Sequence, residues 1–255
     1  MKKRKKMIDE RQRHFNGFSR DTLKFLKSLE ANNSKRWFEK HRADYEQFVL
    51  EPCRSLVNDL GDFMLKIDPR FEITPSINKT ISRIYRDTRF SDDKSLYRSN
   101  FWIVFKRQKK EWSTQVCAYF FEVFKDYYRY GMGFYDAAPA IMKKFREQID
   151  ENTKEFRKVI SFYPRQKTFS LEGETYKRII DKSKPKEIQI WYQRKSMYLV
   201  CNRQIDKVLL SRKLIDNLKY GFEMLAPLYQ YLQKVIRLAL EPEKERAGRL
   251  ILPMQ

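Results

Sequence analysis

The sequence contains few of the residues that most often build metal sites and nucleophilic relays. Only two histidines and three cysteines occur among its 255 residues. Both histidines, His14 and His41, lie near the N-terminus, and the cysteines are far apart without a C-x-x-C pair: Cys53, Cys117 and Cys201. These spacings argue against a disulfide framework, a thiolate zinc site and a histidine-rich metal site. We expect no metal ion, and we interpret the cysteines as small core residues.

Long apolar runs are also missing. No stretch of about eighteen apolar residues is present to cross a membrane. The lysine-rich start, MKKRKKMIDERQRH, leads into no apolar segment of the signal-peptide type. The hydrophobic share of 42% and the aromatic share of 15% are nevertheless ample for a packed core. We therefore expect a globular, cytoplasmic protein with no membrane partner.

Positive charge is what the sequence has in excess. Its 54 Lys and Arg outnumber its 33 Asp and Glu, which gives a formal net charge of +21. Residues 1–14 carry seven basic and two acidic side chains, so most of the excess lies in the rest of the chain. Such an excess is typical of proteins whose partners bear phosphate or other acidic groups. We expect an anionic small molecule or a nucleic acid as partner, and the oligomeric state stays open.

Apolar spacing predicts two helices at the start of the chain. Ser19 is suited to cap the first, which the pair Asn32–Asn33 ends. From Ser34 onward an aromatic face recurs at helical spacing, and Lys35–Glu39 and Arg42–Glu46 are spaced to pair outside it. The residues of that face are Trp37, His41, Tyr45 and Phe48.

After residue 75 the pattern changes to β-branched and aromatic runs joined by short polar turns such as QKKE, which predicts an antiparallel meander. The runs are KTISRIYRD (79–87), SNFWIVFKRQ (99–108), STQVCAYFFEVF (113–124) and DYYRYGMGF (126–134). A helical pattern follows over 138–160, then a predicted hairpin around Gly173 and an extended pair, or a strand plus loop, over 187–201. Pro227 is placed to open a closing helix that ends near Leu240.

This order of elements predicts an α+β fold in which an antiparallel meander sheet packs against N-terminal, middle and C-terminal helices. No repeat, low-complexity linker or obvious domain boundary interrupts the pattern. We therefore predict a single domain over residues 15–240, flanked by a basic, flexible tail at 1–14 and a C-terminal tail at 241–255.

Residues 83–98, RIYRDTRFSDDKSLYR, are called the charged segment below. Five basic side chains and three aspartates share it with two tyrosines and a phenylalanine. Charges this dense must either pair with one another or bind a charged partner. The two alternatives predict different proteins.

The charged segment, together with GFSRDTLKFLKSLEANNSKRWFEKHRADYE at 17–46, closely resembles the bacterial and fungal family catalogued as domain of unknown function 2461. The likeness extends more loosely through YRYGMGFYDAAPAIMKKFREQI and GETYKR. The resemblance implies a family without an established activity, substrate or set of catalytic residues. Where the family usually shows D-K-S-P-Y-K, this chain has Leu96 and Arg98 in place of the proline and the lysine. The lost proline loosens the turn before Tyr97.

One interpretation of the charged segment is structural. As a strand, it places Arg83, Tyr85, Asp87 and Arg89 on one face. Asp87 then pairs with Arg83 or Arg89, and Asp92 or Asp93 pairs with Lys94 or Arg98. The result is a buried polar network that fixes the segment.

The second interpretation, which we prefer, is anion binding. The basic side chains exceed what three aspartates neutralise, and the planar arginine fork suits bidentate binding of phosphate, sulfate or carboxylate. Tyrosines add hydroxyl donors or stack on a base. The predicted ligand-binding residues are Arg83, Arg86, Arg89, Lys94, Tyr97 and Arg98. The predicted supporting residues are Asn33, Trp37, His41, Asp87, Asp92 and Asp93. Basic residues at a hairpin tip, Lys106, Arg107, Lys109 and Lys110, extend the patch or form a solvated turn.

A third interpretation is a metal-assisted hydrolase or nuclease that uses Asp87, Asp92 and Asp93. Asp92-x-Lys94 with an upstream aspartate is similar to an acidic D…(D/E)-x-K magnesium site. However, such a site normally spans two neighbouring strands, and this spacing fits a single loop. His41 lies on the helical face of Trp37, from where it can reach the charged segment as an acid or base or serve as a core residue. The sequence therefore identifies neither an enzymatic activity nor a cofactor.

Overall fold

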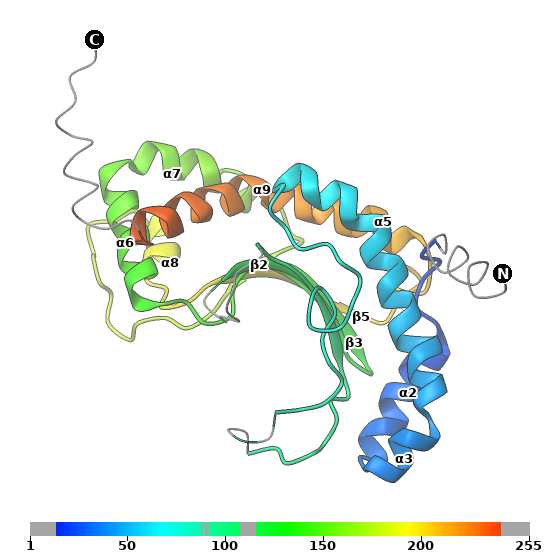
Figure 1. Cartoon of the computed structure of the whole chain (residues 1–255). Helices are drawn as coiled ribbons and strands as arrows, with labels where there is room; N and C mark the ends of the chain where they lie inside the picture. The colour runs from blue at the N-terminus through cyan, green and yellow to red at the C-terminus, as the bar shows by residue number, and fades with distance from the viewer. Residues whose placement is uncertain (1–13, 88, 90–91, 108–115, 241–255) are drawn as a thin grey trace. The chain divides into compact units, whose positions relative to one another are not determined.

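A computed structural model describes residues 14–87, 89, 92–107 and 116–240 of the chain (Figure 1). The five strands of these residues form one antiparallel sheet, in the order β1-β2-β3-β5-β4. The predicted α+β class is confirmed. The QKKE turn, with Lys109 and Lys110, and nearly all of both predicted tails lie outside the described residues. In chain order the elements are α2 (Arg20–Ala31), α3 (Lys35–Lys40), α4 (Arg42–Tyr45), the π-helical turn η1 (Glu46–Leu50), α5 (Glu51–Ile67), β1 (Phe101–Phe105), β2 (Cys117–Val123), β3 (Tyr127–Phe134), α6 (Pro139–Glu151), α7 (Thr153–Ile160), the 3-10 turn η2 (Tyr163–Arg165), β4 (Ser170–Glu172), α8 (Lys186–Tyr192), β5 (Tyr198–Gln204) and α9 (Lys213–Leu240).

The chain divides into two compact units. The first comprises residues 1–111, 118–131 and 200–223, and the second comprises residues 112–117, 132–199 and 224–255. The single domain expected over 15–240 therefore stays a prediction. Among the helices of the described ranges, none has the length and apolar character needed to cross a bilayer.

Helix α2 begins where the sequence predicts its cap. Ser19 Oγ accepts a hydrogen bond from Thr22 N, and Thr22 Oγ1 accepts one from Ser19 N, each at 3.1 Å. The same Thr22 hydroxyl donates to Phe48 O at 2.6 Å and so ties the start of α2 to η1. The apolar face of α2 buries Phe25, Leu26 and Leu29.

The second predicted helix is interrupted at His41. Ser34 caps α3 by accepting a hydrogen bond from Trp37 N, but the backbone of His41 leaves the helical region, with φ −109° and ψ 19°. Because of this break, Arg42 Nη2 binds Glu39 Oε1 at 2.7 Å, and the predicted pairing of Arg42 with Glu46 is wrong.

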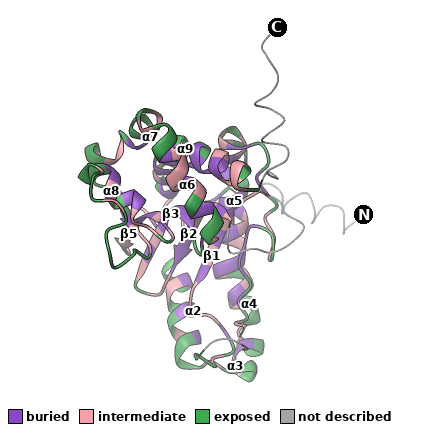
Figure 2. Ribbon diagram, turned by 90° about the vertical axis from the view of Figure 1, so that its left-hand side faces the viewer, coloured by how far each residue is buried: buried purple, intermediate pink, exposed green. Residues whose placement is uncertain are grey.

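In the first unit, aromatic residues pack against β1 and β2. The antiparallel register of these strands pairs Ile103 with Phe121. The ring centroid of Phe18 lies 5.2 Å from that of Phe101 and 5.8 Å from that of Phe121. Alternate residues of β1 are buried, as expected for a strand with one face on the core. Figure 2 shows this burial along the two strands in purple.

In the second unit, aromatic rings from α6, α7, α8 and α9 form the core. The centroid of Phe156 lies 5.4 Å from that of Phe145 and 5.9 Å from that of Trp191, both edge to face. Tyr231 completes the group at 5.4 Å. In the same unit, Gly133 has a φ of +156°, and a Cβ there would lie 2.4 Å from Tyr198 Cα, so only glycine fits.

The strand predicted over residues 79–87 is wrong. The structure has isolated bridges in this region, and Figure 1 shows a long irregular connection between α5 and β1. Ile81, Ser82 and Ile84 are all buried, so the alternation of a half-buried strand is absent. The segment is held by contacts from elsewhere in the first unit rather than by strand pairing along its length.

Two predictions for the second half of the chain need correction. Of the extended pair, or strand plus loop, predicted over 187–201, the strand is present as the start of β5 (Tyr198–Gln204), but the rest differs. Residues 187–192 lie in helix α8 because Ile188, Trp191 and Tyr192 recur at helical spacing and are buried, whereas Ile190 is exposed. No hairpin forms around Gly173, because β4 lies beside β5 in the sheet.

Pro227 lies inside α9 and does not open a new helix. A proline in a helix costs about 3 kcal/mol, because it removes one hydrogen bond and crowds the preceding turn. Leu225, Leu228 and Leu232 are buried on both sides of it, so packing along one face offsets this cost. Leu240 is the last residue that the structure describes, so the predicted end of the helix near it stays a prediction.

Glu72, between α5 and β1, is a buried carboxylate of the first unit. Its Oε1 accepts hydrogen bonds from Thr74 N at 3.0 Å and Thr74 Oγ1 at 2.5 Å, and its Oε2 lies 3.4 Å from Lys79 Nζ. Burial raises the pKa of Glu72, but the hydrogen bonds from Thr74 and Lys79 outweigh it, so that the pKa lies below its ordinary value.

We expect Glu72→Gln to lower the free energy of unfolding at pH 7 by about 2 kcal/mol, because it removes ionic hydrogen bonds. The folded-state pKa lies below the unfolded-state pKa, so this stabilisation is present above pH about 4.3 and is lost as the pH falls through the folded-state pKa. Urea titrations across this range measure it. The stability of the wild type is expected to fall more steeply than that of the variant, and parallel curves would contradict the assignment.

Candidate functional site

The two longest motifs of the sequence meet at Asn33 and Tyr97. Asn33 lies in the turn between α2 and α3. Its Nδ2 donates to Tyr97 O at 2.8 Å, and its Oδ1 accepts from Tyr97 N at 2.9 Å. One side-chain amide thus pairs with a backbone as a neighbouring strand would. This contact fixes the end of the charged segment against the N-terminal helices of the first unit.

Tyr97 in turn forms an antiparallel bridge with Tyr85. Arg86 N donates to Leu96 O at 2.9 Å, and Arg98 N donates to Ile84 O at 2.8 Å. Tyr85 and Tyr97 therefore project from one face of the bridge, with ring centroids 5.0 Å apart. The side chains of the residues on either side of them project from the opposite face.

The tyrosine face packs against α3. The ring of Tyr97 stacks on Phe38 with centroids 4.4 Å apart, and Tyr85 lies 5.9 Å from Phe38. Tyr97 is 1% exposed, whereas Tyr85 is 46% exposed. Burial, followed by the neighbouring Tyr85, raises the pKa of Tyr97 to about 12. The predicted ligand-binding residue Tyr97 is thus a packing residue, and Tyr85 is the accessible member of the pair.

The opposite face of the bridge carries Arg86 and Arg98. The Arg98 guanidinium lies 4.9 Å from the Trp102 ring centroid. Arg86 has a side chain only 20% exposed, and its Nη2 lies 3.0 Å from Asp93 Oδ2. Arg86 Nε is buried and has no hydrogen-bond partner among the described residues. Two predicted ligand-binding arginines therefore share one face of one short bridge.

The remaining charges form exposed pairs. Arg89 Nε and Nη2 bind the two oxygens of Asp87 at 3.0 and 2.8 Å, and Arg83 Nη2 lies 3.8 Å from Asp87 Oδ2. The hydrogen bonds from Arg89 hold the pKa of Asp87 well below its usual range. Both predicted partners of Asp87 are confirmed. The predicted burial is wrong, because the side chains of Arg83 and Arg89 are 53% and 76% exposed.

Asp93 is placed by the backbone. Its Oδ1 accepts a hydrogen bond from Ser95 N at 2.9 Å, and the hydrogen bonds from Ser95 lower the pKa of Asp93, as does Arg86. The sequence analysis missed the ion pair of Asp93 with Arg86, because it predicted Lys94 or Arg98 as the partner. Asp92 and Lys94 are exposed.

His41 and Trp37 form a separate stack on α3. Their ring centroids are 4.0 Å apart, and His41 Nδ1 lies 2.8 Å from Trp37 O. A carbonyl only accepts, so Nδ1 carries the proton and Nε2 of the neutral ring is an acceptor. A role of His41 toward the arginines stays a prediction.

Arg42 joins the site although the sequence analysis did not name it among the site residues. Its guanidinium lies 5.5 Å from the Phe38 ring centroid. Hydrogen bonds to Glu39 and then to Tyr85 raise its pKa. The signal available in the sequence was its position four residues after Phe38, one helical turn away.

Arg107 does not extend the basic patch. Its Nε binds Asp68 Oδ2 at 2.6 Å, and the Asp68 side chain is 2% exposed, so the pair is structural. Among the described residues, no group of three or more His, Cys, Asp or Glu is arranged to hold a metal ion.

A family model described as a conserved hypothetical protein, domain of unknown function 2461, matches residues 21–231. The chain belongs to this family. The match includes Asn33 and the whole charged segment, so the resemblance that these motifs carried is confirmed. A comparison with curated proteins gives no match. The family description assigns no activity, and the function must therefore be argued from the site.

We expect Asn33→Ala to lower the free energy of unfolding by about 2–4 kcal/mol, because it leaves a buried N–H and a buried C=O of Tyr97 without partners. The neighbouring Asn32 is the matched control. Its Nδ2 donates to Ser28 O at 2.9 Å on the exposed end of α2, so Asn32→Ala should cost less than about 1 kcal/mol. Urea denaturation measures both, and equal losses would contradict the role of Asn33.

Proposed function

We propose that the protein binds a phosphate-bearing ligand at the face of the Tyr85–Tyr97 bridge that carries Arg86 and Arg98. The observation that carries the proposal is the placement of Arg86. Its guanidinium is mostly buried and its Nε has no hydrogen-bond partner among the described residues. A buried donor without an acceptor is costly unless a ligand or water supplies one.

The charge balance supports an anion at this face. Asp87 already forms ion pairs with Arg89 and Arg83. On the face of Arg86 and Arg98, Asp93 contributes the carboxylate that the structure pairs with Arg86. This carboxylate accepts from the guanidinium as an external oxyanion would, and phosphate oxygens are acceptors for the same donors. We infer that a ligand phosphate exchanges with Asp93 on Arg86.

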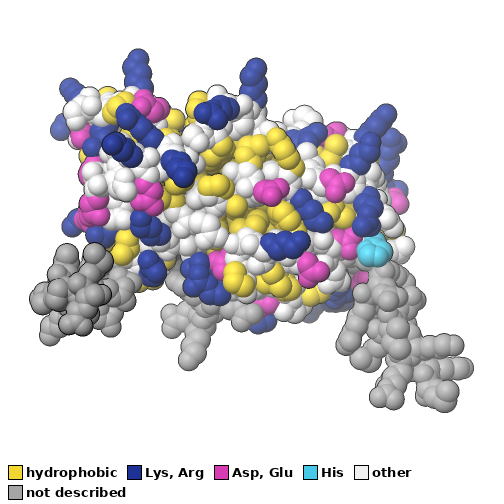
Figure 3. All heavy atoms as spheres, turned by 90° about the horizontal axis from the view of Figure 1, so that it is seen from above, with side chains coloured by type: hydrophobic (Ala, Val, Ile, Leu, Met, Phe, Trp, Pro, Cys, Tyr) yellow, Lys and Arg dark blue, Asp and Glu magenta, His cyan; other side chains and the backbone are white. Residues whose placement is uncertain are grey.

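The formal net charge of +21 supports attraction of such a ligand over a longer range. Figure 3 shows Lys and Arg side chains spread over the face it draws, with fewer Asp and Glu among them. Near the bridge, Lys35, Arg36 and Lys40 of α3 are exposed. A distributed positive potential raises the association rate of polyanions and makes binding sensitive to salt.

The structural alternative has its own observation, which is the bidentate pair of Asp87 and Arg89. Exposed ion pairs of this kind contribute little to stability, so they do not by themselves explain the charge density. No observation in the described residues favours the metal-assisted hydrolase.

We expect titration with polyphosphate, nucleotides and short RNA to stabilise the wild type, by about 2.7 kcal/mol at a ligand concentration one hundred times the Kd. Arg86→Ala should weaken binding by at least about tenfold, because it removes a charge-assisted contact. Asp93→Asn should strengthen binding, because it removes the competing carboxylate. Thermal denaturation and isothermal titration measure these changes, and the ligand that binds tightest identifies the phosphate class.

Arg89→Ala is the matched control, because its guanidinium is already bound by Asp87 and is far more exposed than that of Arg86. It should change affinity less than Arg86→Ala. If no ligand stabilises the wild type while Arg86→Ala and Asp93→Asn both lower its melting temperature, the charged segment is a structural network and the proposal is wrong.

A further inference from the structure

A second surface, in the second unit, combines exposed apolar and basic side chains. Residues 174–185, called the isoleucine loop, lead into α8. Ile179 and Ile180 are adjacent and 52% and 44% exposed, and Tyr176 is 40% exposed. Ile190, on the outer side of α8, is 42% exposed. A folded protein gains nothing from exposing neighbouring isoleucines, so such a group indicates a binding surface.

Two glutamine side chains, one in α8 and one directly after it, form hydrogen bonds with the backbone of the isoleucine loop. Gln193 Nε2 donates to Tyr176 O at 2.7 Å and also to Arg178 O, while its Oε1 accepts from Ile180 N at 3.0 Å. Gln189 Nε2 donates to Lys184 O at 2.7 Å. The loop therefore presents its isoleucines from a fixed backbone, and these main-chain groups are already used.

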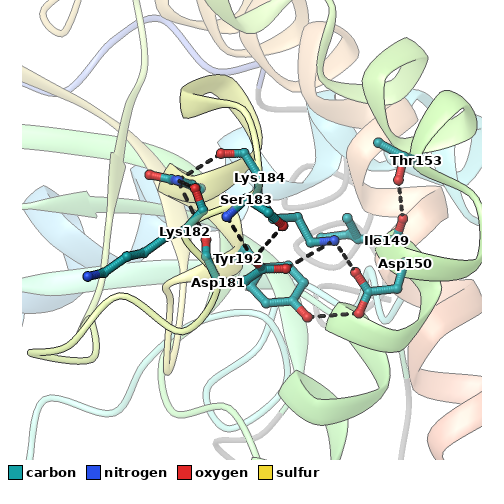
Figure 4. A network of polar contacts seen from close by, with 9 residues as sticks. Ile149, Asp150, Thr153, Asp181, Lys182, Ser183, Lys184 and Tyr192 are labelled. Carbon is teal, nitrogen blue, oxygen red and sulfur yellow. Dashed lines mark hydrogen bonds and ion pairs between the residues drawn. The ribbon is translucent and has the colours of Figure 1, made fainter.

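Figure 4 shows how the end of the loop is clamped to α6. Asp150 accepts a hydrogen bond from Tyr192 Oη at 2.8 Å and lies 2.6 Å from Lys184 Nζ. Asp181 Oδ1 accepts from Ser183 N at 2.8 Å. Lys184 points into this network, whereas the ammonium of Lys182 points away from it.

Several basic side chains near the isoleucines form no ion pair with another described residue. The nearby carboxylates already form ion pairs. Asp181 Oδ2 lies 3.6 Å from Lys184 Nζ, Glu187 Oε1 lies 3.2 Å from Arg157 Nη2, and Glu174 Oε2 lies 3.8 Å from Lys195 Nζ. Four further cations are exposed and form no ion pair with another described residue: Lys177, Arg178, Lys182 and Lys186. The exposed isoleucines of the loop thus lie between exposed cations along the chain.

We propose that the isoleucine loop docks the protein on an anionic lipid surface. Ile179 and Ile180 enter the boundary between headgroups and acyl chains, and the four cations lie at lipid phosphates. Gln189 and Gln193 already satisfy several main-chain groups of the loop, which lowers the cost of carrying bare peptide groups to that depth. The same bonds leave those groups unavailable to a peptide that adds as a strand.

This inference does not depend on the phosphate-bearing ligand proposed for the first unit. It departs from the expectation of no membrane partner, which rested on the lack of spanning and signal segments. A loop that lies in the interface requires neither.

The test is sedimentation of the full chain with vesicles of phosphatidylcholine alone or mixed with phosphatidylserine. We expect binding to the mixed vesicles. The double variant Ile179→Ser, Ile180→Ser keeps the net charge and should reduce that binding at least about tenfold. Tyr220→Ser is the matched control, because it removes an exposed aromatic residue of α9 in the first unit and should leave binding unchanged. Circular dichroism checks that each variant is folded.

A second readout separates lipid from other polyanions. Ile180→Trp should show a blue-shifted emission with mixed vesicles and none with RNA or heparin. The proposal is overturned if the wild type does not bind mixed vesicles, or if the double serine variant binds them as the wild type does. It is also overturned if RNA shifts the tryptophan emission as vesicles do, because the loop then recognises charge without insertion.

Discussion

The structure of the candidate site depends on one side-chain amide. Asn33 supplies both hydrogen bonds that the buried backbone of Tyr97 needs. A backbone held at one point has one register, and the bridge from Tyr97 to Tyr85 follows from it. Because side chains alternate across that bridge, the tyrosines turn toward α3 and Arg86 and Arg98 turn away. The placement of two arginines on one face is thus a consequence of a helix turn more than sixty residues earlier in the chain.

The ion pairs of Asp87 with Arg83 and Arg89 do not by themselves account for the density of charge in residues 83–98. These ion pairs are solvent-exposed, and pairs of that kind are weak and screened by salt. Arg86 differs from Arg83 and Arg89, because it is largely buried and its Nε has no hydrogen-bond partner among the described residues. The proposed anion site rests on this difference, since an external oxyanion would replace the carboxylate of Asp93 on Arg86.

In both proposed surfaces, side-chain amides hold an irregular segment through hydrogen bonds to its backbone. In the first unit an asparagine fixes a segment through its backbone, and in the second unit two glutamines do so for the isoleucine loop. Side-chain amides both donate and accept, so they satisfy irregular backbone without imposing a strand or a helix. Some side chains of each segment, such as Arg83 and Ile180, then face outward, whereas others, such as Tyr97, pack inside the unit. Fixed presentation lowers the entropy lost on binding, whatever the partner.

The sequence by itself determined what local chemistry controls: the cap at Ser19, the strands at 101–105, 117–123 and 127–134, the α+β class and the family. It also found Arg83 and Arg89 as partners of Asp87, because they are two and four residues away. The tertiary structure alone decided that residues 79–87 form no strand, that α9 continues through Pro227, and that Tyr97 is buried. It also paired Arg86 with Asp93 and Asn33 with Tyr97. These outcomes follow from contacts between residues distant in the chain, which override local propensity and leave no periodic trace in the sequence.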